Sequence, residues 1–502
     1  MIKKAIFLIL ILGLISRAYF MKDVFFYDWD EGIYAETTSE LFARRTLQPY
    51  FNGQIYLDKP PLSNYVISAG WFLIKDPEFG ARLAMVVFAV LMLILTYLLS
   101  KKIYDVISHG SLKNMSLWER ESMYMLPVLL TASTPLFLER STQLNTDVML
   151  GVAWLAYFFF FDQYAYKLIA LSIGVWTKSL LGFYPLLFEI LKIKKITFTK
   201  RGYMKGAALL IVPSLWYLWH FMQYGNYFLR IHLVDQIVKR AAVPIELHMG
   251  NKWYYTELLI KNLHVFLIVL GVSYIWMLWD VFDLGKLWKN PLNLLKKAQQ
   301  VQQSKNFSMF LILFSALPFF VFLNLAKSKI SWYLATIMPL FTLVLPYVYL
   351  KIRSRNVRYI FFILIVAYFM YRFVPATFAL RVSNVQPANH VKVALCLRER
   401  PEQTISVLEP EQERKNRNYL EASHQQTETS FMYGGMPSFI YYTGKHINFY
   451  WKLEEFQKVL AQKGVTVLSK SDYENIVSIR TAADTMTLIP ECSFGMWRVY
   501  SR

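Results

Sequence analysis

The sequence predicts a polytopic α-helical membrane protein with a small soluble α/β domain after its last membrane-spanning helix. Three observations indicate this class. Hydrophobic residues make up 55% and aromatic residues 17% of the 502 residues, more than a water-exposed surface usually accommodates. Apolar runs long enough to cross a bilayer recur throughout residues 1–376. The basic residues, which give a net charge of +20, fall mostly between those runs.

The apolar runs predict about 11–13 transmembrane helices, at about 20 residues for each crossing. The first follows Lys3 and Lys4 and has the layout of a signal peptide, but no small-residue cleavage site closes it well, so we interpret it as an uncleaved helix. The stretches lie near 4–21, 81–100, 122–138, 146–161, 166–178, 180–191, 205–222, 261–282, 308–325, 332–350 and 357–376.

Loop charge predicts the orientation. With a cytoplasmic N-terminus, nearly every inside loop is rich in lysine and arginine, and the short loop around Asp162 is the exception. The long loops 22–80 and 223–260 then lie on the outer side with the C-terminal domain. Because this rule accounts for the excess of basic residues, we expect no nucleic-acid partner.

The composition changes after the last apolar run, so residues 377–502 are predicted to form the outer α/β domain and residues 1–376 the membrane domain. Residues 454–463 have helical spacing, and 409–413 and 423–430 are interpreted as loops. Four β-rich runs predict strands at 438–443, 465–468, 476–479 and 496–500.

Both cysteines, Cys396 and Cys492, lie in the predicted α/β domain. In an oxidising compartment a pair near the two ends of one small domain forms a disulfide; the alternative is two buried thiols. The sequence leaves both open.

Three carboxylates follow the first helix: Asp28, Asp30 and Glu31. They lie among aromatic residues, where a partly desolvated carboxylate is suited to accept a proton or bind a cation. Asp30 and Glu31 are adjacent and point in different directions on any regular backbone, so they need not share a role. The alternative is a group of solvated loop acids.

Other outer segments carry charge close to apolar runs. Lys59 is followed by two prolines that hold an extended turn, and Asp147 opens a helix, where it serves either a site or the free N–H groups of that helix. Lys327 and Lys329 stand on the outer side against the general charge pattern, as ligands for an anion or as side chains reaching lipid headgroups.

Basic and aromatic residues also alternate in the loop 223–260, which includes Lys239, Arg240 and His248. This pattern suits an amphipathic segment at the membrane surface and equally a groove for a phosphorylated lipid. The sequence has no His/Cys cluster with metal-ligand spacing, no Gly-rich phosphate loop and no nucleophile elbow.

Together these residues resemble a known family. Asp30-Glu31 after the first helix, Lys59-Pro60-Pro61, Thr146-Asp147, Thr177-Lys178 and Lys327-x-Lys329-x-x-x-Tyr333 are similar in order and spacing to bacterial members of the dolichyl-phosphate-mannose protein mannosyltransferase superfamily. Within that superfamily they resemble the lipid A 4-amino-4-deoxy-L-arabinose transferases, which have the GT-C fold.

The resemblance implies an integral glycosyltransferase of the bacterial inner membrane. It would move a sugar, with inversion, from a polyprenyl-phosphate carrier such as undecaprenyl phosphate to a periplasmic acceptor: lipid A, another glycolipid or a protein. Asp30 would be the principal catalytic carboxylate, with Glu31 beside it and Asp147 as a second acid. The family's substrate contacts fall on Lys59, Lys327, Lys329 and Tyr333, and on either Lys239 or Arg240.

The chain also departs from the family pattern. Asp58 stands where the arabinose transferases tend to have glutamate, so the family's metal site is in doubt here. Asp58 and His248 are the two candidate ligands for a possible divalent metal, and no other cofactor is expected. Ser331-Trp332-Tyr333 replaces their Leu-Pro-x-Tyr form, which argues against the same substrate.

The competing function is a transporter or flippase for a lipid-linked sugar. Transporters place paired charges inside their helices and often contain inverted repeats, and this sequence shows neither. The cluster of outer carboxylates and lysines therefore favours the enzyme.

Overall fold

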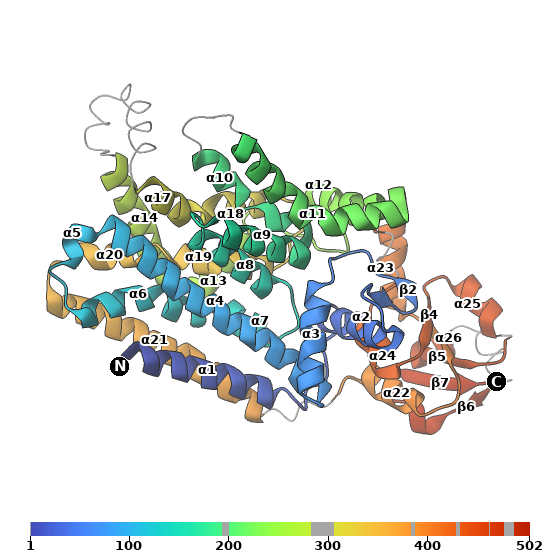
Figure 1. Ribbon diagram of the computed structural model, residues 1–502. Coiled ribbons are helices and arrows are strands. Elements are labelled where there is room, and N and C mark those ends of the chain that lie inside the picture. Colours follow the sequence, from blue (N-terminus) through green and yellow to red (C-terminus); the bar gives the residue numbers. More distant parts are fainter. Residues whose placement is uncertain are drawn as a thin grey trace.

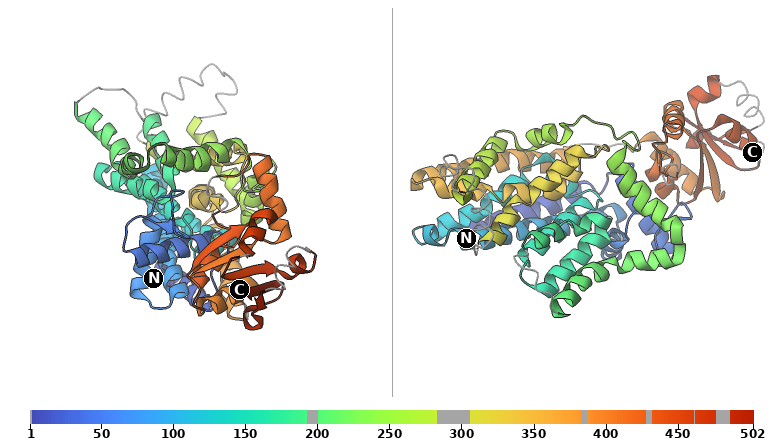
Figure 2. Two further views of the ribbon diagram at one scale, coloured as in Figure 1. Left: turned by 90° about the vertical axis from the view of Figure 1, so that its right-hand side faces the viewer. Right: turned by 90° about the horizontal axis from the view of Figure 1, so that it is seen from above.

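The computed structural model describes residues 2–192, 200–282, 306–382, 387–427, 432–460, 462–475 and 486–502. A bundle of helices makes up most of the molecule, and a small α/β unit extends from one end of it (Figures 1 and 2). The predicted fold class, a helical membrane protein with a C-terminal α/β unit, is confirmed.

Each apolar stretch falls on helical segments. They are α1 (Ile2–Phe20), α4 (Pro77–Ile107), α6 (Leu117–Ala132) with α7 (Pro135–Arg140), α8 (Asp147–Phe159), α9 (Tyr164–Lys178), η1 (Ser179–Phe183) with α10 (Leu186–Lys192), α11 (Lys200–Phe228), α14 (Phe266–Phe282), α17 (Phe307–Phe314) with α18 (Ala316–Leu325), α19 (Tyr333–Thr342) with α20 (Leu345–Lys351), and α21 (Arg355–Val382).

Length and composition alone mark fewer of these as spans. Among the described residues, 4 helical stretches are long and apolar enough to cross a membrane, or 5 if the pair α13 (Tyr254–Leu263) and α14, bent by 106°, is one span. The total of 11–13 spans stays a prediction. The four stretches are Pro77–Ile107, Phe307–Leu325, Tyr333–Lys351 and Arg355–Ala379.

Ion pairs bring the basic segments to one end of the bundle. Lys3 lies 3.2 Å from Glu121, and Arg358 lies 3.2 Å from Glu119, so the N-terminus and the starts of α6 and α21 meet. This end, which also carries α5 (His109–Leu112), lies far from the α/β unit in Figure 1. The arrangement agrees with the alternation of loop charge; which side faces the cytoplasm stays a prediction.

The two long segments predicted as outer loops, 22–80 and 223–260, are largely folded and are called the outer segments below. The first contains α2 (Asp30–Arg44), the hairpin of β1 (Tyr50–Phe51) and β2 (Gln54–Ile55), and α3 (Leu62–Leu73). The second contains the π-helix η2 (Leu229–Lys239), α12 (Arg240–Ala242) and the start of α13. Both lie at the end of the bundle that meets the α/β unit (Figure 1).

The α/β unit has one five-stranded sheet in the order β4-β3-β5-β7-β6. β3 is parallel to β4 and β5, and β7 is antiparallel to β5 and β6. Its elements are α22 (Asn389–Arg398), β3 (Thr404–Leu408), α23 (Glu411–Ala422), α24 (Pro437–Thr443), β4 (His446–Tyr450), α25 (Leu453–Leu460), β5 (Val465–Ser469), α26 (Lys470–Asn475), β6 (Thr487–Leu488), η4 (Pro490–Cys492) and β7 (Trp497–Ser501).

The strands predicted at 465–468 and 496–500 are confirmed as β5 and β7, and the predicted helix at 454–463 as α25. The strand predicted at 438–443 is wrong, because these residues form α24. Pro437 suits the first turn of a helix, and Gly444 ends it at φ 62°. Packing of α24 against α2, and of its Tyr441 and Tyr442 against Phe26, overrides the strand propensity of these residues. Residues 476–479 lie outside the described residues.

Two further predictions in this unit have clear outcomes. The loop predicted at 409–413 is wrong, because Glu411 and Glu413 open α23 after Pro410, where acidic side chains favour a helix N-terminus. Cys396 on α22 and Cys492 on η4 form a disulfide across 96 residues of sequence, which decides between the two alternatives.

Candidate active site

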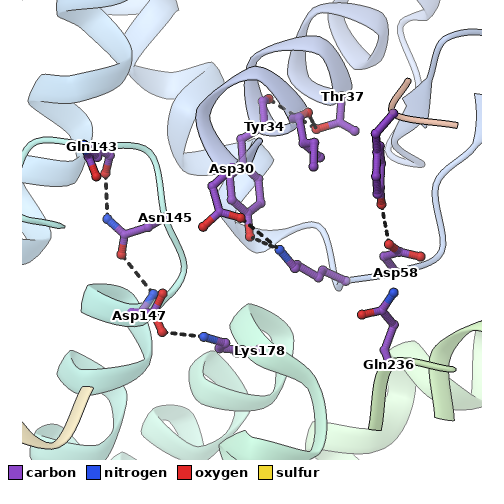
Figure 3. A network of polar contacts seen from close by, with 12 residues as sticks. Asp30, Tyr34, Thr37, Asp58, Gln143, Asn145, Asp147, Lys178 and Gln236 are labelled. Atoms are coloured by element: carbon purple, nitrogen blue, oxygen red, sulfur yellow. Dashed lines mark hydrogen bonds and ion pairs between the residues drawn. The ribbon is translucent and has the colours of Figure 1, made fainter. Parts of the chain in front are cut away.

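A cavity of about 150 Å³ lies where the outer segments meet the helical bundle. Its lining comes from the loop before α2, the β2–α3 connection, the start of α8, the end of α9, η2 and the α18–α19 connection. Charged side chains occupy one part of the wall, and apolar side chains of η1, η2 and α18 occupy another. Figure 3 shows Asp30, Asp58, Asp147 and Lys178 gathered from distant parts of the chain.

Asp30 is the first residue of α2 and lines the cavity. The preceding Trp29 also lines it and has φ 72°, a left-handed conformation that a bulky residue rarely adopts. This strained residue turns the chain into α2. A carboxylate at a helix N-terminus also faces the unpaired N–H groups of the first turn.

Cations surround the Asp30 carboxylate. Arg140 Nη2 donates to Oδ2 at 3.0 Å, and Lys59 Nζ lies 3.7 Å from Oδ1. Burial raises the pKa of Asp30, but the charges of Lys59, Arg140 and Lys178 outweigh it and hold the pKa below its ordinary value. Asp30 is therefore ionised at neutral pH.

Asp147, on α8, is buried and pairs with two cations. Lys178 Nζ donates to Oδ1, and Arg140 Nη2 lies 3.9 Å from Oδ2. The start of α8 is satisfied by another residue, because Asn145 Oδ1 accepts from the backbone N–H groups of Asp147 and Val148 at 3.0 and 3.1 Å. The side chain of Asp147 is thus available to the cavity rather than serving as a helix cap.

Lys178 also lies over the ring of Tyr333, 4.1 Å from its centroid, so Tyr333 borders the same charged wall. Arg140 lies over the ring of Trp332 at 4.9 Å. The two aromatic residues before and at the start of α19 therefore hold the cations that contact Asp147.

Lys59 approaches the other carboxylate oxygen of Asp30, Oδ1, whereas Arg140 contacts Oδ2. Its ammonium donates to the Tyr34 hydroxyl at 3.0 Å. Burial lowers the pKa of Lys59, but Tyr34, Tyr56 and Asp30 together raise it well above its ordinary value, so Lys59 stays charged. The neighbouring Asp58 accepts a hydrogen bond from the hydroxyl of Tyr433, which the α/β unit contributes to the cavity.

The α/β unit also holds the loop that carries Asp30. Ser438 donates to Asp28 from both its backbone N–H, at 3.1 Å, and its hydroxyl, and His390 Nε2 lies 2.8 Å from Asp28. The Phe26 N–H donates to the Tyr442 hydroxyl at 2.7 Å. Gly32 allows the backbone of α2 to approach α24 closely, because a Cβ at this position would lie 2.5 Å from the Ser438 nitrogen.

Arg240 and Glu246 form an ion pair of 2.9 Å at a further part of the wall, beside His248. Burial raises the pKa of Glu246, but Arg240 and His248 lower it below its ordinary value. Burial lowers the pKa of His248, with an opposing contribution from Glu246, so the imidazole is neutral at neutral pH.

The structure places several predicted site residues outside the lining. Glu31 is buried against Arg82 at 2.8 Å and accepts the Leu144 N–H at 3.1 Å, so it joins the outer segment to α4. Lys329 donates to the carbonyls of Leu323 and Asn324 at 3.0 and 2.7 Å, the last turn of α18.

Lys239 and Lys327 also lie outside the lining. Lys239 pairs with Asp235 at 2.6 Å, and Lys327 is exposed. Of the two residues near the family arginine, Arg240 is the one in the cavity wall. The residues that the structure brings together are thus Asp30, Asp58, Lys59, Asp147, Arg240, His248 and Tyr333.

Two cations at the centre of the site were not assigned from the sequence. Lys178 appeared only in the Thr177-Lys178 match, and Arg140, in the short loop before Asp147, was given no role. Their roles depend on pairing across 31 and 110 residues of sequence. The signal that could have pointed to Arg140 is an arginine on the predicted outer side, in the same short loop as a carboxylate.

Among the described residues, no group of three or more His, Cys, Asp or Glu side chains could hold a metal ion. The two metal candidates, Asp58 and His248, both line the cavity, with Asp58 already bonded to Tyr433. The donor set near them lacks the ligands for a closed metal site.

No protein-family model matches the sequence. Among curated proteins, the undecaprenyl phosphate-alpha-4-amino-4-deoxy-L-arabinose arabinosyl transferase 1 of Pseudomonas fluorescens is 24% identical over 333 residues, 62% of this chain and 53% of that protein. An uncharacterized protein of Aquifex aeolicus is 23% identical over 229 residues, 43% of each. The chain thus spans about half the length of the curated relatives it matches.

Solved structures match almost the whole fold. ArnT from Cupriavidus metallidurans, bound to undecaprenyl phosphate, superposes with a TM-score of 0.68 at 13% identity, covering 99% of this chain and 97% of that one. An oligosaccharyltransferase of Archaeoglobus fulgidus gives 0.50 at 10% identity, covering 99% and 74%. The fold is therefore the GT-C fold that the resemblance predicted.

Proposed function

We propose that this protein is an integral-membrane glycosyltransferase that takes a sugar from a polyprenyl-phosphate carrier. The observation that carries the proposal is the composition of one cavity. Asp30 lies there beside Lys59, Arg140 and Lys178, and the same cavity has an apolar lining from α18, half of a span candidate. A lipid phosphate has a charged head and an apolar chain, so its site needs both cationic and apolar side chains. The GT-C fold and the arabinosyl transferase relative support the same reaction class.

The apolar wall suits a polyprenyl chain. Phe319, Phe322 and Leu323 of α18 and Leu180 of η1 line it, and Phe322 and Leu180 are also 46% and 42% exposed. An apolar surface of this kind at the edge of a helical bundle is stabilised by contact with a hydrocarbon chain. A carrier entering between α18 and η1 would bring its phosphate toward Lys178 and Lys59.

The cations serve the departing phosphate. As the sugar–phosphate bond breaks, negative charge grows on the leaving oxygens, and fixed cations in a site shielded from water lower the energy of that state. Lys59 and Lys178 are the cations of the lining nearest the carboxylates, with Arg140 behind them.

Asp30 is proposed to act on the acceptor. The surrounding cations lower the pKa of Asp30 and by themselves make it a weak base. A phosphate bound to the same cations offsets their charge, which raises the pKa of Asp30 when the donor is in place. Asp30 would then take the proton of an acceptor hydroxyl as its oxygen bonds to the anomeric carbon and the carrier phosphate leaves. One displacement inverts that carbon.

Asp147 is proposed to hold Lys178 and Arg140 in place for the phosphate, and Glu31 to position the Asp30 loop through Arg82. The acceptor is proposed to be lipid A, another glycolipid or a protein. The site is proposed to lie on the periplasmic side of a bacterial inner membrane, which the positive-inside pattern supports.

The test uses purified protein in lipid nanodiscs with a synthetic polyprenyl-phosphate sugar and envelope lipid extract. We expect the donor to be consumed and a glycosylated product to appear by mass spectrometry. Comparing envelope glycolipids and glycoproteins with and without the gene identifies the acceptor. Sugar-lipid movement across the bilayer without any new glycosidic bond would replace the enzyme with a flippase.

A further inference from the structure

The wall of the cavity beside Arg240 carries polar atoms that the proposed reaction does not use. Nε2 of Gln236, Oε1 of Glu246 and Nδ1 of His248 are buried and have no hydrogen-bond partner among the described residues; the His248 nitrogen lies 3.8 Å from Oε2 of Glu246, beyond hydrogen-bond distance. All three residues line the cavity. Buried polar atoms are nearly always bonded in native proteins, and an unpaired one costs about 1–3 kcal/mol. Three on one wall indicate a ligand that bonds to them.

In Gln236 and Glu246, the other terminal atom of the side chain is hydrogen-bonded to Arg240. Arg240 Nε donates to Gln236 Oε1 at 2.9 Å, and Arg240 Nη2 donates to Glu246 Oε2 at 2.9 Å. The guanidinium therefore fixes both groups and leaves their second atoms directed elsewhere. In Figure 3 the Gln236 nitrogen points up toward Asp58. The Glu246 side chain is only 4% exposed.

The backbone that presents this wall is strained and well anchored. Glu246 and Leu247 have φ of 53° and 60°, in the left-handed region that non-glycine residues rarely occupy. Ser328 accepts the Ile245 N–H at 3.0 Å, and the Lys329 N–H donates to the His248 carbonyl at 2.9 Å. The segment before α19 thus holds Glu246 and Leu247 in a costly conformation, with His248 directly after them, as expected where a ligand contact is needed.

The chemistry of the wall excludes a phosphate. Arg240 is already neutralised by Glu246, and the free atoms are one amide donor, one carboxylate acceptor and one neutral imidazole nitrogen. A ligand that matches them offers both donors and acceptors and carries no negative charge. Hydroxyl groups on a ring have this property. The aromatic rings of Trp29 and Tyr433 border the same cavity, where a sugar ring packs well.

We propose that Gln236, Glu246 and His248 form the subsite that binds the hydroxyl groups of the transferred sugar and select the sugar by their positions. The inference rests on the proposed function, since it assigns the sugar end of the same donor. It places the phosphate at Lys59 and Lys178 and the sugar against Arg240's partners. A site built to bond a hydroxyl strongly rejects an analogue that lacks it, because its polar atoms are then left unpaired.

The experiment measures binding of two probes to the full-length protein in nanodiscs: a short-chain polyprenyl phosphate alone, and the same lipid carrying one pentose or hexose. The variants are Gln236→Met, which keeps the side-chain volume, and Glu246→Gln, which keeps the bond to Arg240. Gln223→Leu, at an exposed glutamine of α11, is the matched control. We expect each variant to lose about tenfold in affinity for the sugar lipid. Binding of the bare lipid phosphate should not weaken in either variant, and Glu246→Gln, which leaves the charge of Arg240 uncompensated, should if anything strengthen it.

A second measurement uses wild-type protein and sugar lipids lacking one hydroxyl, so it does not depend on the folding of a variant. One deoxy donor should bind about tenfold more weakly than its parent, and Gln236→Met should add no further loss for that donor. Equal losses for both probes, no loss in any variant and with any deoxy donor, or binding that needs a divalent cation would each overturn the subsite. If wild-type protein binds neither probe, the proposed function itself fails.

Discussion

Arg140 and Asp30 meet across 110 residues of sequence, with Arg140 Nη2 donating to Asp30 Oδ2 at 3.0 Å. The same nitrogen lies 3.9 Å from Asp147, so one guanidinium joins both acids of the cavity. Because Arg140 is 4% exposed, its charge is poorly screened by water and strongly influences both carboxylates.

Arg140→Gln should therefore shift the pH dependence of transfer. Arg140 helps to lower the pKa of Asp30, so its loss raises that pKa, and Asp30 becomes protonated at a higher pH. The acid limb of the kcat/KM profile should move to higher pH, with activity at neutral pH lowered about tenfold or more. Arg353→Gln, on an exposed residue at the far end of the bundle, is the control. An unshifted acid limb would remove Asp30 as the titrating group.

Asp30→Asn should leave a folded, membrane-inserted protein with transfer reduced about a hundredfold or more, about 3 kcal/mol of transition-state stabilisation. Glu36→Gln on the same helix is the control. Burial, together with Glu40, raises the pKa of Glu36 to about 8, so Glu36 is mostly protonated at neutral pH and glutamine resembles it. Donor consumption is the assay. If Glu36→Gln is the inactive variant, the catalytic carboxylate has been misassigned.

Lys59 and Lys329 should differ in what their loss affects. Lys59→Met removes a cation from the cavity and should raise the donor KM as well as lower the rate. Lys329→Met leaves two carbonyls of α18 without their donor, so it should lower the free energy of unfolding by about 1–3 kcal/mol. Thermal melting and initial rates separate the two. A raised donor KM in stable Lys329→Met protein would return Lys329 to the phosphate site.

The disulfide between Cys396 and Cys492 predicts the behaviour of thiol reagents. In unfolded but unreduced protein, a maleimide mass tag should add to neither cysteine, and after reduction to both. Addition before reduction would exclude the bond.

Labelling of single cysteines tests the orientation. Gln54 is exposed in the hairpin between α2 and α3, whereas the neighbouring Asn52 is buried and bonded to the Ile447 carbonyl at 2.7 Å. In a variant without Cys396 and Cys492, a membrane-impermeant maleimide should reach Gln54→Cys from the periplasm and Asn114→Cys only after the membrane is opened. The reverse pattern would invert the topology and place the site in the cytoplasm.

Much of the fold could be predicted because hydrophobic burial depends on local sequence. Every apolar stretch falls on helical segments, and the runs that form β5 and β7 were found. The strand predicted at 438–443 failed because α24 packs against α2 and its Tyr441 and Tyr442 contact Phe26, across about 400 residues of sequence, which no local pattern reveals.

The site was predicted only in part, because some of its residues stand out in the local sequence and others depend on long-range packing. Asp30, Lys59 and Asp147 stand out as charges next to apolar runs. The difference between Asp30 in the cavity and Glu31 against Arg82 depends on which face of α2 meets α4, and that is a property of packing. Gln236 could not be predicted as a site residue, because a glutamine on a helix is most often a surface residue and only its neighbours in the fold indicate otherwise.

The clamp of Ser438, His390 and Tyr442 on the Asp28 loop has a consequence for biosynthesis. The loop before Asp30 is held by side chains that come up to 416 residues later in the chain. Asp30 therefore cannot reach its final position until those residues have been made. While the helices enter the membrane one after another, the ribosome has not yet released the part that finishes the site. We therefore expect the proposed transferase activity only after the α/β unit has been made, and a chain that inserts but ends before this unit should leave the donor lipid unchanged.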